Sequence, residues 1–211
     1  MRFLLALLGL FLWIIPQQGM TQNLSLDNLS IHVGTEYSKM QWKDVEQSNP
    51  FNRPMNDFTV SPHVKLSYSL YSDSQFTLNI HSGYSKLNFK EHYSIPTATT
   101  VNQRISMHTL SVGAEGLFNI YNFQVGPMLS GYKLLDSDLR VNYTNGDYKY
   151  TGSMDDYLAN ESLELGLVLR RKIGSHFLIS LEGLFGTMDI FSPDYYEGNL
   201  QHFRATIGYE F

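Results

Sequence analysis

The chain has 211 residues, with 15 Lys plus Arg against 20 Asp plus Glu and no cysteine. Its formal charge of −5 excludes the basic surface that nucleic-acid binding requires, so we expect no nucleic-acid partner. The lack of cysteine excludes disulfide scaffolds, thiolate metal sites and cysteine nucleophiles. Only 17% of the residues are charged whereas 14% are aromatic, which is unusual for a protein whose whole surface meets water.

The first residues have the three-part organisation of a secretory signal peptide. Arg2 supplies a basic start, residues 3–15 carry no charge, and Pro16 ends any helix before a short polar segment. An apolar stretch of this length spans about 20 Å as a helix, short of a hydrocarbon core of about 30 Å. We therefore predict a signal peptide at 1–21 and an exported domain at 22–211. The alternative is an uncleaved membrane anchor.

Apolar and polar residues alternate with a period of two in eight later segments. These segments are 29–37, 60–70, 76–84, 110–115, 123–130, 163–169, 177–186 and 202–211. Helices would place apolar residues three and four apart, so the period predicts strands. The connections alternate between short polar turns, at 71–75, 119–122 and 171–176, and long segments, at 43–58, 88–103, 134–160 and 188–201. This is the plan of an all-β, eight-stranded, antiparallel, up-and-down transmembrane β-barrel.

A soluble eight-stranded barrel or sandwich would alternate as well, so the character of the polar face has to separate the two. In a soluble protein that face meets bulk water and should carry many Lys and Glu residues. Here it is mostly Gly, Ser, Thr, Asn and His, and seven strands place a glycine on it: Gly34, Gly83, Gly113, Gly126, Gly166, Gly186 and Gly208. Glycine fits a crowded, strongly coiled interior. We therefore expect the polar face to line a narrow lumen and the apolar face to meet lipid.

The end of the chain carries a resemblance to a known family. The segment from Phe203 to Phe211 resembles the C-terminal strand of Gram-negative outer-membrane proteins, with apolar or aromatic residues at alternate positions before a final Phe. Together with the signal peptide and the Val125-Gly-Pro127 strand segment, the sequence resembles the small outer-membrane β-barrel domain family. The resemblance implies a location in the cell outer membrane. It also implies that the barrel-assembly machinery recognises the last strand, with Phe203, Tyr209 and Phe211 as the assembly signal.

Three places depart from the pattern. Pro62 and Pro127 lie inside predicted strands although proline cannot donate to a ladder, so each should mark a bulge or a break in pairing. In the third strand, Leu87 and Phe89 take the parity of the polar residues after Lys86. A bulge near Ser85, or emergence of the strand above the membrane, would each explain that change.

Six charged residues share the inward parity and form the strongest candidate site: Glu36, Lys65, Glu115, Glu164, Glu182 and Arg204. Buried charges are stable only when they are paired, and contacts of Arg204 with Glu182 and Glu36 are geometrically feasible across neighbouring strands. One interpretation is a structural network that plugs a lumen too narrow to conduct freely. The other is a gated ion path lined by carboxylates.

Two further groups of polar residues raise the question of metals. His32, His63 and His81 share the inward parity on successive strands, which a metal cluster would require, although satisfied interior histidines are commoner. Acidic residues concentrate in the longest predicted loop without the spacing of a calcium loop. These are Asp136, Asp138, Asp147, Asp155 and Asp156. We expect a solvated acidic loop, no metal site and no cofactor.

Some small outer-membrane barrels are lipid-modifying hydrolases, which would need Ser, His and a carboxylate together near the outer rim. Asp73 and Ser74 lie in a turn at the opposite rim, His108 has no evident nucleophile beside it, and neither His92 nor His202 stands out. We therefore predict a protein that is not an enzyme and has no catalytic residues.

Aromatic residues gather in two places. One group lies near the short-turn ends of the strands, where an interfacial girdle would sit: Tyr68, Phe76, Phe123, Phe177, Tyr209 and Phe211. Another lies in the long connections: Trp42, Phe51, Phe58, Tyr93, Tyr143, Tyr148, Tyr150, Tyr157, Tyr195 and Tyr196. The second group can form a recognition surface or pack together to close the mouth of the barrel.

These features lead to one main functional hypothesis and two alternatives. We expect a non-catalytic outer-membrane scaffold that presents extracellular loops for binding, or an accessory subunit of an outer-membrane complex. The expected partners are outer-membrane lipid and lipopolysaccharide, the barrel-assembly machinery during insertion, and an outer-membrane protein. The alternatives are a small ion-conducting pore through the charged lumen and, less favoured, a lipid-modifying hydrolase.

Overall fold

Where the computed structural model describes the chain, the residues lie almost entirely in antiparallel strands. It describes residues 26–43, 59–95, 99–143, 149–153, 158–186 and 197–211. Among these residues, a 3-10 turn at Leu26–Asn28 precedes the first strand. The strands in chain order are β1 (Leu29–Lys43), β2 (Val60–Ser72), β3 (Phe76–Ile95), β4 (Thr99–Ile120), β5 (Phe123–Tyr143), β6 (Lys149–Ser153), β7 (Glu161–Ile173), β8 (Phe177–Gly186) and β9 (Glu197–Glu210). In the part of the chain that the structure describes, no helix is long and apolar enough to cross a bilayer.

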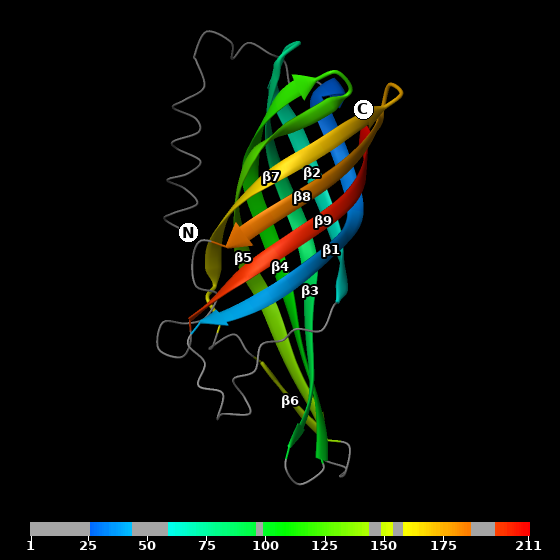
Figure 1. The fold of residues 1–211 in the computed structure, drawn as a ribbon. Helices are drawn as coiled ribbons and strands as arrows, with labels where there is room; N and C mark the ends of the chain where they lie inside the picture. The colour runs from blue at the N-terminus through cyan, green and yellow to red at the C-terminus, as the bar shows by residue number, and fades with distance from the viewer. Residues whose placement is uncertain (1–25, 44–58, 96–98, 144–148, 154–157, 187–196) are drawn as a thin grey trace.

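Eight of the described strands close into a ring, as the sequence predicts. Each strand pairs antiparallel with its neighbours in the order β1-β2-β3-β4-β5-β7-β8-β9, and β9 returns to pair with β1 (Figure 1). The short strand β6 lies outside the ring and pairs with β5. The short turns and the C-terminus lie together at one end of the barrel.

The two faces of the sheet differ as the transmembrane interpretation requires. Side chains of Leu165, Leu181 and Ile207 are exposed on the outside, at 51%, 40% and 64%, whereas Glu182 and Arg204 are buried in the lumen. A soluble barrel would bury the first set and expose the second, because exposed apolar surface of this extent is stable only against lipid. The prediction of a lipid-facing apolar face and a polar lumen is therefore confirmed.

Glycine allows the lumen to be narrow at particular points. A Cβ atom added at Gly34 would lie 2.0 Å from the carbonyl oxygen of Ala205, and one at Gly113 would lie 2.2 Å from that of Leu129. Both distances are far inside van der Waals contact, so these strands approach each other more closely than any side chain would allow.

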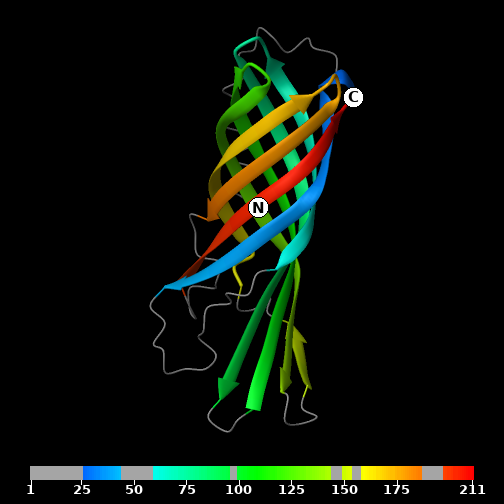
Figure 2. The same ribbon diagram turned by 45° about the vertical axis from the view of Figure 1, so that its right-hand side comes forward.

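The long connections predicted at 88–103 and 134–160 are wrong in large part, because strands occupy most of both segments. β3 and β4 stay paired from Phe76↔Phe118 to Ile95↔Thr99, and β5 runs on to Tyr143 beside β6. Asp136 and Asp138 therefore lie on β5, while Asp147, Asp155 and Asp156 lie outside the described residues. Figure 2 shows β3, β4, β5 and β6 continuing well past the ring at the end opposite the C-terminus. We call this extension, residues 86–95, 99–108, 136–143 and 149–153, the arm.

The change of parity in β3 is not a bulge. The register between β3 and β4 is continuous through Ser85, and Leu87 and Phe89 are buried on the inward face. Pairing with β2 ends at His63↔Ser85, so β3 leaves the ring there and its inner face becomes apolar. Emergence above the barrel wall is therefore the explanation that the structure supports.

Both prolines lie at breaks in a ladder. The β2–β3 pairing begins at His63, one residue after Pro62, which pairs only with Thr35 of β1. Pro127 pairs with Leu167 of β7, but β5 has no β4 partner between Met128 and Val125. The register on the two sides of that gap is the same, so it is a break without a bulge. The register shifts lie elsewhere, between Ser69 and Tyr71 and between His108 and Thr109.

Candidate functional site

The six inward charges predicted from the sequence all lie buried in one network that also contains Arg170 and His202. We call this set the lumen charge network: Glu36, Lys65, Glu115, Glu164, Arg170, Glu182, His202 and Arg204. Every member lies on a strand of the ring and takes the inward position of the alternation. The period of two thus aims side chains from six strands into one narrow space.

Arg204 connects two carboxylates across the β8–β9–β1 part of the wall. It lies directly opposite Glu36 on β1 and Glu182 on β8. Its Nε atom is 3.2 Å from Oε2 of Glu36, and its Nη1 atom is 3.8 Å from Oε2 of Glu182. Ser85 of β3 donates a further hydrogen bond to Oε2 of Glu36, at 2.5 Å. The guanidinium therefore forms ion pairs with both carboxylates of the strands beside it.

Lys65 carries the network across the lumen to strands that are not its neighbours. Its ammonium group donates to Glu182 of β8 and lies 3.6 Å from Oε2 of Glu115 on β4. Glu115 accepts further hydrogen bonds from Arg170 of β7 and from Asn79 of β3, the latter at 2.9 Å. A contact from β2 to β4 and β8 is feasible only because eight strands leave a lumen one side chain wide.

His202 lies between two carboxylates at the other end of the network. Its Nδ1 atom is 2.5 Å from Oε1 of Glu36, and its Nε2 atom is 2.7 Å from Oε1 of Glu164. Carboxylates have no proton to donate, so the doubly protonated, charged ring is the form that suits both of these ion-pair contacts. The Ser38 hydroxyl also lies 2.8 Å from Nδ1 of His202. With His202 charged, four cations balance four carboxylates in a space that excludes bulk water.

Sequence reasoning missed Arg170 and His202. Arg170 shares the inward parity with Glu164, but it lies one residue beyond the predicted strand 163–169 and directly before the predicted turn 171–176. His202 precedes Arg204 by two residues on β9 and therefore has the same parity. In both cases the inward parity can be read from the sequence. Both residues were overlooked because they lie at the boundaries of predicted strands. The prediction that His202 is an unremarkable residue of the rim is wrong.

Apolar layers accompany the network inside the barrel. One buried cluster lies on the β4, β5, β7 and β8 wall: Leu117, Met128, Val168 and Leu184. A second lies where the arm leaves the ring: Leu87, Phe89, Ile105, Met107, Tyr132, Leu134, Leu158 and Leu200. Buried side chains therefore fill the lumen through its charged middle and at its arm end.

The inward histidines do not gather into a metal site. Among the described residues, no group of three or more His, Asp or Glu side chains has the arrangement that a metal ion needs. His63 is 2.7 Å from the Ser85 hydroxyl, and His32 is 3.0 Å from the Ser30 hydroxyl. These two rings are thus parts of the interior hydrogen-bonding system.

The candidate hydrolase residues lie apart. The Asp73 carboxylate accepts hydrogen bonds from the Tyr71 hydroxyl and from the backbone N–H groups of Gln75 and Phe76 in a short turn. These hydrogen bonds hold the pKa of Asp73 below its ordinary value. His108 lies on the outward face near the other rim, where its Nδ1 atom is 2.6 Å from the Tyr84 hydroxyl. The side chain of His92 lies outside the described residues.

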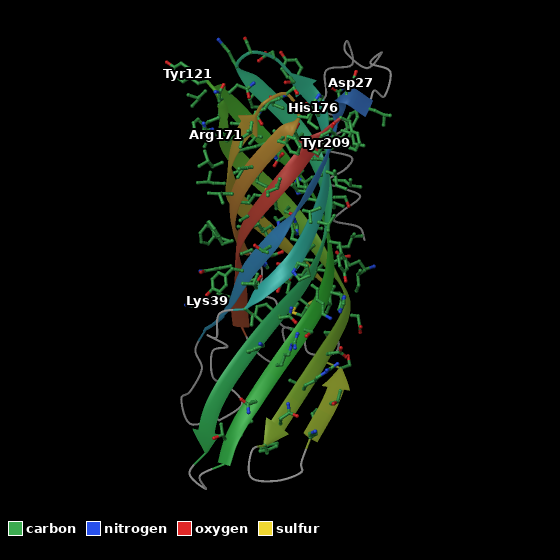
Figure 3. The ribbon with its side chains drawn as sticks, turned by 90° about the vertical axis from the view of Figure 1, so that its right-hand side faces the viewer. Asp27, Lys39, Tyr121, Arg171, His176 and Tyr209 are labelled. Atoms are coloured by element: carbon green, nitrogen blue, oxygen red, sulfur yellow. The ribbon has the colours of Figure 1, made fainter. Side chains whose placement is uncertain are left out.

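The three residues of the expected assembly signal line the outward face at the end of the chain. Phe203, Tyr209 and Phe211 are exposed, and the Tyr209 ring packs edge-on against Phe211 and Phe177. Figure 3 shows Tyr209 beside His176 at the short-turn end, where an aromatic girdle is expected, and the two rings are stacked. Phe76 and Phe118 form a further edge-on pair on neighbouring strands.

Comparison with known proteins identifies the fold. No protein-family model matches the sequence, and no curated protein matches it. Among solved structures, Ail, the attachment invasion locus protein of Yersinia pestis, crystallised with the heparin analogue sucrose octasulfate, matches with a TM-score of 0.50 at 13% identity. That match covers 87% of this chain and 97% of Ail.

Two other structures match to the same degree. Neisserial surface protein A matches with a TM-score of 0.50 at 10% identity, over 87% of this chain and 97% of that one. The outer-membrane protease OmpT from Escherichia coli matches with a TM-score of 0.51 at 11% identity. That match covers 92% of this chain and 100% of OmpT. At these identities the likeness concerns the fold, not the activity. The chain has the fold of the small outer-membrane β-barrel proteins of Gram-negative bacteria.

Proposed function

We propose that this protein is an integral outer-membrane protein with a closed lumen, which acts by binding a partner through its arm. The observation that carries the proposal is the length of β3, β4 and β5, at 20, 22 and 21 residues, against 10 residues for β8. A barrel that only had to cross the bilayer would need about 9–11 residues in each strand. The additional residues build a paired sheet that extends beyond the membrane.

The orientation follows from the loops. Small outer-membrane barrels place short turns in the periplasm and long loops outside the cell. The short turns Ser72–Phe76, Ile120–Phe123 and Ile173–Phe177 lie at one end, and the arm lies at the other. The arm therefore faces the exterior.

The filled lumen argues against the alternative of a pore. An ion entering from the arm end would meet the buried cluster around Phe89 and Met107, and then the lumen charge network. Crossing an apolar layer costs an ion its hydration shell, and paired charges offer no free site to replace it. The network supports a structural role, in which oppositely charged side chains pair with one another and occupy the lumen.

Catalysis has no support among the described residues either. The fold itself does not decide the question, because the matching structures include an attachment protein and a protease. The Asp73 carboxylate is used to close a turn, and His108 has a tyrosine hydroxyl beside it. We therefore propose a non-catalytic role, as binding scaffold or as accessory subunit of an outer-membrane assembly.

The natural absence of cysteine permits a direct test of the arrangement. Thr151→Cys lies in the exposed β6 of the arm, and Asn122→Cys lies in the exposed turn between β4 and β5. A membrane-impermeant maleimide added to intact cells should label Thr151→Cys and leave Asn122→Cys unlabelled until the cells are lysed. Labelling of Asn122→Cys alone would overturn the proposed orientation.

Binding and conduction need separate experiments. A photo-crosslinking residue at Tyr150, which is 48% exposed on the arm, should yield a discrete adduct in native membranes, and the same residue at Phe177 should not. Purified barrel in planar bilayers should show no steady conductance. Steady single-channel currents, together with the absence of any adduct from the arm, would favour the pore instead.

A further inference from the structure

Asn88 lies at the point where the arm leaves the ring. The ladder between β2 and β3 ends at His63↔Ser85, and within the described residues β3 has no ladder partner on that side from Lys86 onwards. Asn88 takes the outward position of the alternation, yet it is only 7% exposed. A buried polar residue with an apolar neighbour on either side in the sequence has to be explained by its hydrogen bonds.

Two side chains at the beginning of β2 take the place of the missing ladder. The backbone N–H group of Asn88 donates to the Ser61 hydroxyl oxygen, at 3.1 Å, and the Thr59 hydroxyl donates to the Asn88 carbonyl oxygen. In a continued ladder these two backbone groups would pair with the backbone of β2. The side-chain amide of Asn88 also donates to the Ser61 oxygen, at 3.3 Å. Three hydrogen bonds thus join β3 to β2 after their backbone pairing has ended.

The rest of the Asn88 side chain holds the arm itself. Its Oδ1 atom accepts hydrogen bonds from Nη2 of Arg104, at 2.7 Å, and from the Ser106 hydroxyl, at 3.0 Å, both on β4. Its Nδ2 atom also donates to the carbonyl oxygen of Lys86, at 3.2 Å. Every polar atom of Asn88 is therefore used, and the residue joins the beginning of β2 to both β3 and β4. We call Thr59, Ser61 and Asn88 the clasp.

The clasp supports the arm differently from the apolar residues at its base. The buried cluster around Phe89 and Met107 lies on the inward face, where apolar side chains pack together. Such contacts resist separation but have no preferred direction, so they tolerate sliding. Hydrogen bonds require particular distances and angles, and a fully satisfied buried polar group selects one arrangement. The clasp can therefore fix the direction of the arm in a way that the apolar cluster cannot.

We infer that Asn88 is a positioning residue for partner binding, which acts with Thr59 and Ser61 to hold the arm in the direction in which it meets its partner. This inference rests on the proposed function, in which a partner binds the arm. A surface that is already held in place loses less conformational entropy on binding. An arm that swings presents the binding direction for only a fraction of the time, and its apparent affinity falls by that fraction.

The first experiment measures the direction of the arm. The chain has no cysteine, so spin labels can be attached at Thr151→Cys on the arm and at Leu66→Cys, which is exposed on the ring part of β2. Double electron–electron resonance on the full mature chain in micelles gives the distribution of distances between the two labels. Asn88→Ala removes the amide, and Thr59→Val/Ser61→Ala removes both hydroxyls. Each of these variants should broaden the distribution.

Matched variants separate the clasp from a general loss of stability. Asn79→Ala removes a buried amide from the same strand, but inside the ring, where Asn79 donates to Glu115 at 2.9 Å. It should lower stability without broadening the distribution. Thr59→Ser keeps the hydroxyl and should keep the wild-type distribution as well. Heat-modifiable migration on gels verifies that each variant is a folded barrel.

The second experiment measures partner binding in native membranes, with the photo-crosslinking residue at Tyr150. Each lost hydrogen bond should lower the population of the held direction by roughly fivefold. The yield of adduct per folded barrel should therefore fall by about that factor or more in Asn88→Ala. In Asn79→Ala the yield per folded barrel should equal that of the wild type.

The possible results separate this inference from the proposed function. Unchanged distance distributions in Asn88→Ala and in Thr59→Val/Ser61→Ala would overturn the inference, as would equal broadening in Asn79→Ala. A broadened distribution with an undiminished adduct yield would also overturn it, because the direction of the arm would then have no effect on the partner. If the wild-type chain forms no adduct while the distance distributions change as expected, the proposed function fails and the clasp still holds the arm.

Discussion

Glu36 and Arg204 lie directly opposite each other on β1 and β9, the pair of strands that closes the barrel. The Nε atom of Arg204 is 3.2 Å from Oε2 of Glu36, and both side chains are buried in the lumen. The first and last strands of the ring are far apart in sequence, so this ion pair is part of what fixes the register at the seam. A slip of one residue would turn Glu36 towards lipid.

Glu36→Gln should destabilise the barrel by about 3–5 kcal/mol, because it leaves buried positive charge on Arg204 and His202 with fewer partners. The free energy of unfolding in detergent micelles, measured by denaturant titration and gel migration, checks this value. Glu210→Gln is the matched control, since Glu210 pairs with Lys172 at a half-exposed position. That exposed pair should contribute no more than about 1 kcal/mol. Equal losses in the two variants would contradict the assigned role of the buried pair.

The sequence predicts the ring well because period-two alternation indicates both that a segment is a strand and which of its residues face the lumen or the lipid. The arm was missed because the residues on the inward face change from polar to apolar at Ser85. Below it the inward residues are polar, as at His81, and above it they are apolar, as at Leu87 and Phe89. Asn88, on the outward parity, is buried by Ser61 and Ser106. Beyond Ser85 the strand continues, but the apolar residues take the inward positions that polar residues hold in the ring. In the sequence this reversal looks like the end of the strand.

Period-two alternation also predicts which charged residues point into the lumen. It does not predict most of the contacts that these residues make with one another. Neighbouring pairs such as Glu182 and Arg204 follow from strand order. The contacts of Lys65 with Glu115 and Glu182 cross the lumen and depend on its width, which no single strand reveals. Arg170 required a more accurate strand boundary, because the predicted turn begins at residue 171 whereas β7 runs on to Ile173.

Gly113→Ala should destabilise the barrel by about 1–3 kcal/mol, since the added Cβ atom would lie 2.2 Å from the Leu129 carbonyl oxygen and must displace backbone. Gly183→Ala is the control, because nothing lies within 4 Å of its added Cβ atom. That variant should match the wild type or gain up to about 1 kcal/mol from the stiffer unfolded chain. Denaturant titrations of the two variants in the same micelles make the comparison. A Gly113→Ala variant as stable as Gly183→Ala would contradict this prediction, because it would mean that β4 and β5 can move apart without cost.

Leu165→Arg should destabilise the inserted barrel by about 2–4 kcal/mol, because Leu165 is half exposed on the outward face and a charge there must enter hydrocarbon. The same change at Leu26, which is 71% exposed before the first strand, should change stability by about 0.5 kcal/mol or less. Reversible folding into phosphatidylcholine vesicles provides the measurement. Equal stability of the two variants would mean that Leu165 does not face lipid.

Deletion of Phe211 separates assembly from stability. The Phe211 side chain is half exposed, and it adds to the folded barrel one edge-on ring contact with Tyr209 and one backbone hydrogen bond to Leu29, at 3.1 Å. Its loss should therefore cost the folded barrel only about 1–2 kcal/mol. If the last strand is recognised during insertion, as the resemblance implies, the deletion should lower the amount of folded barrel in cells far more than that cost explains. Phe177→Ala, which also loses an exposed ring against Tyr209, serves as control. Equal cellular yields for the two variants, or a deletion variant that also fails to fold in micelles, would remove the assembly role from Phe211.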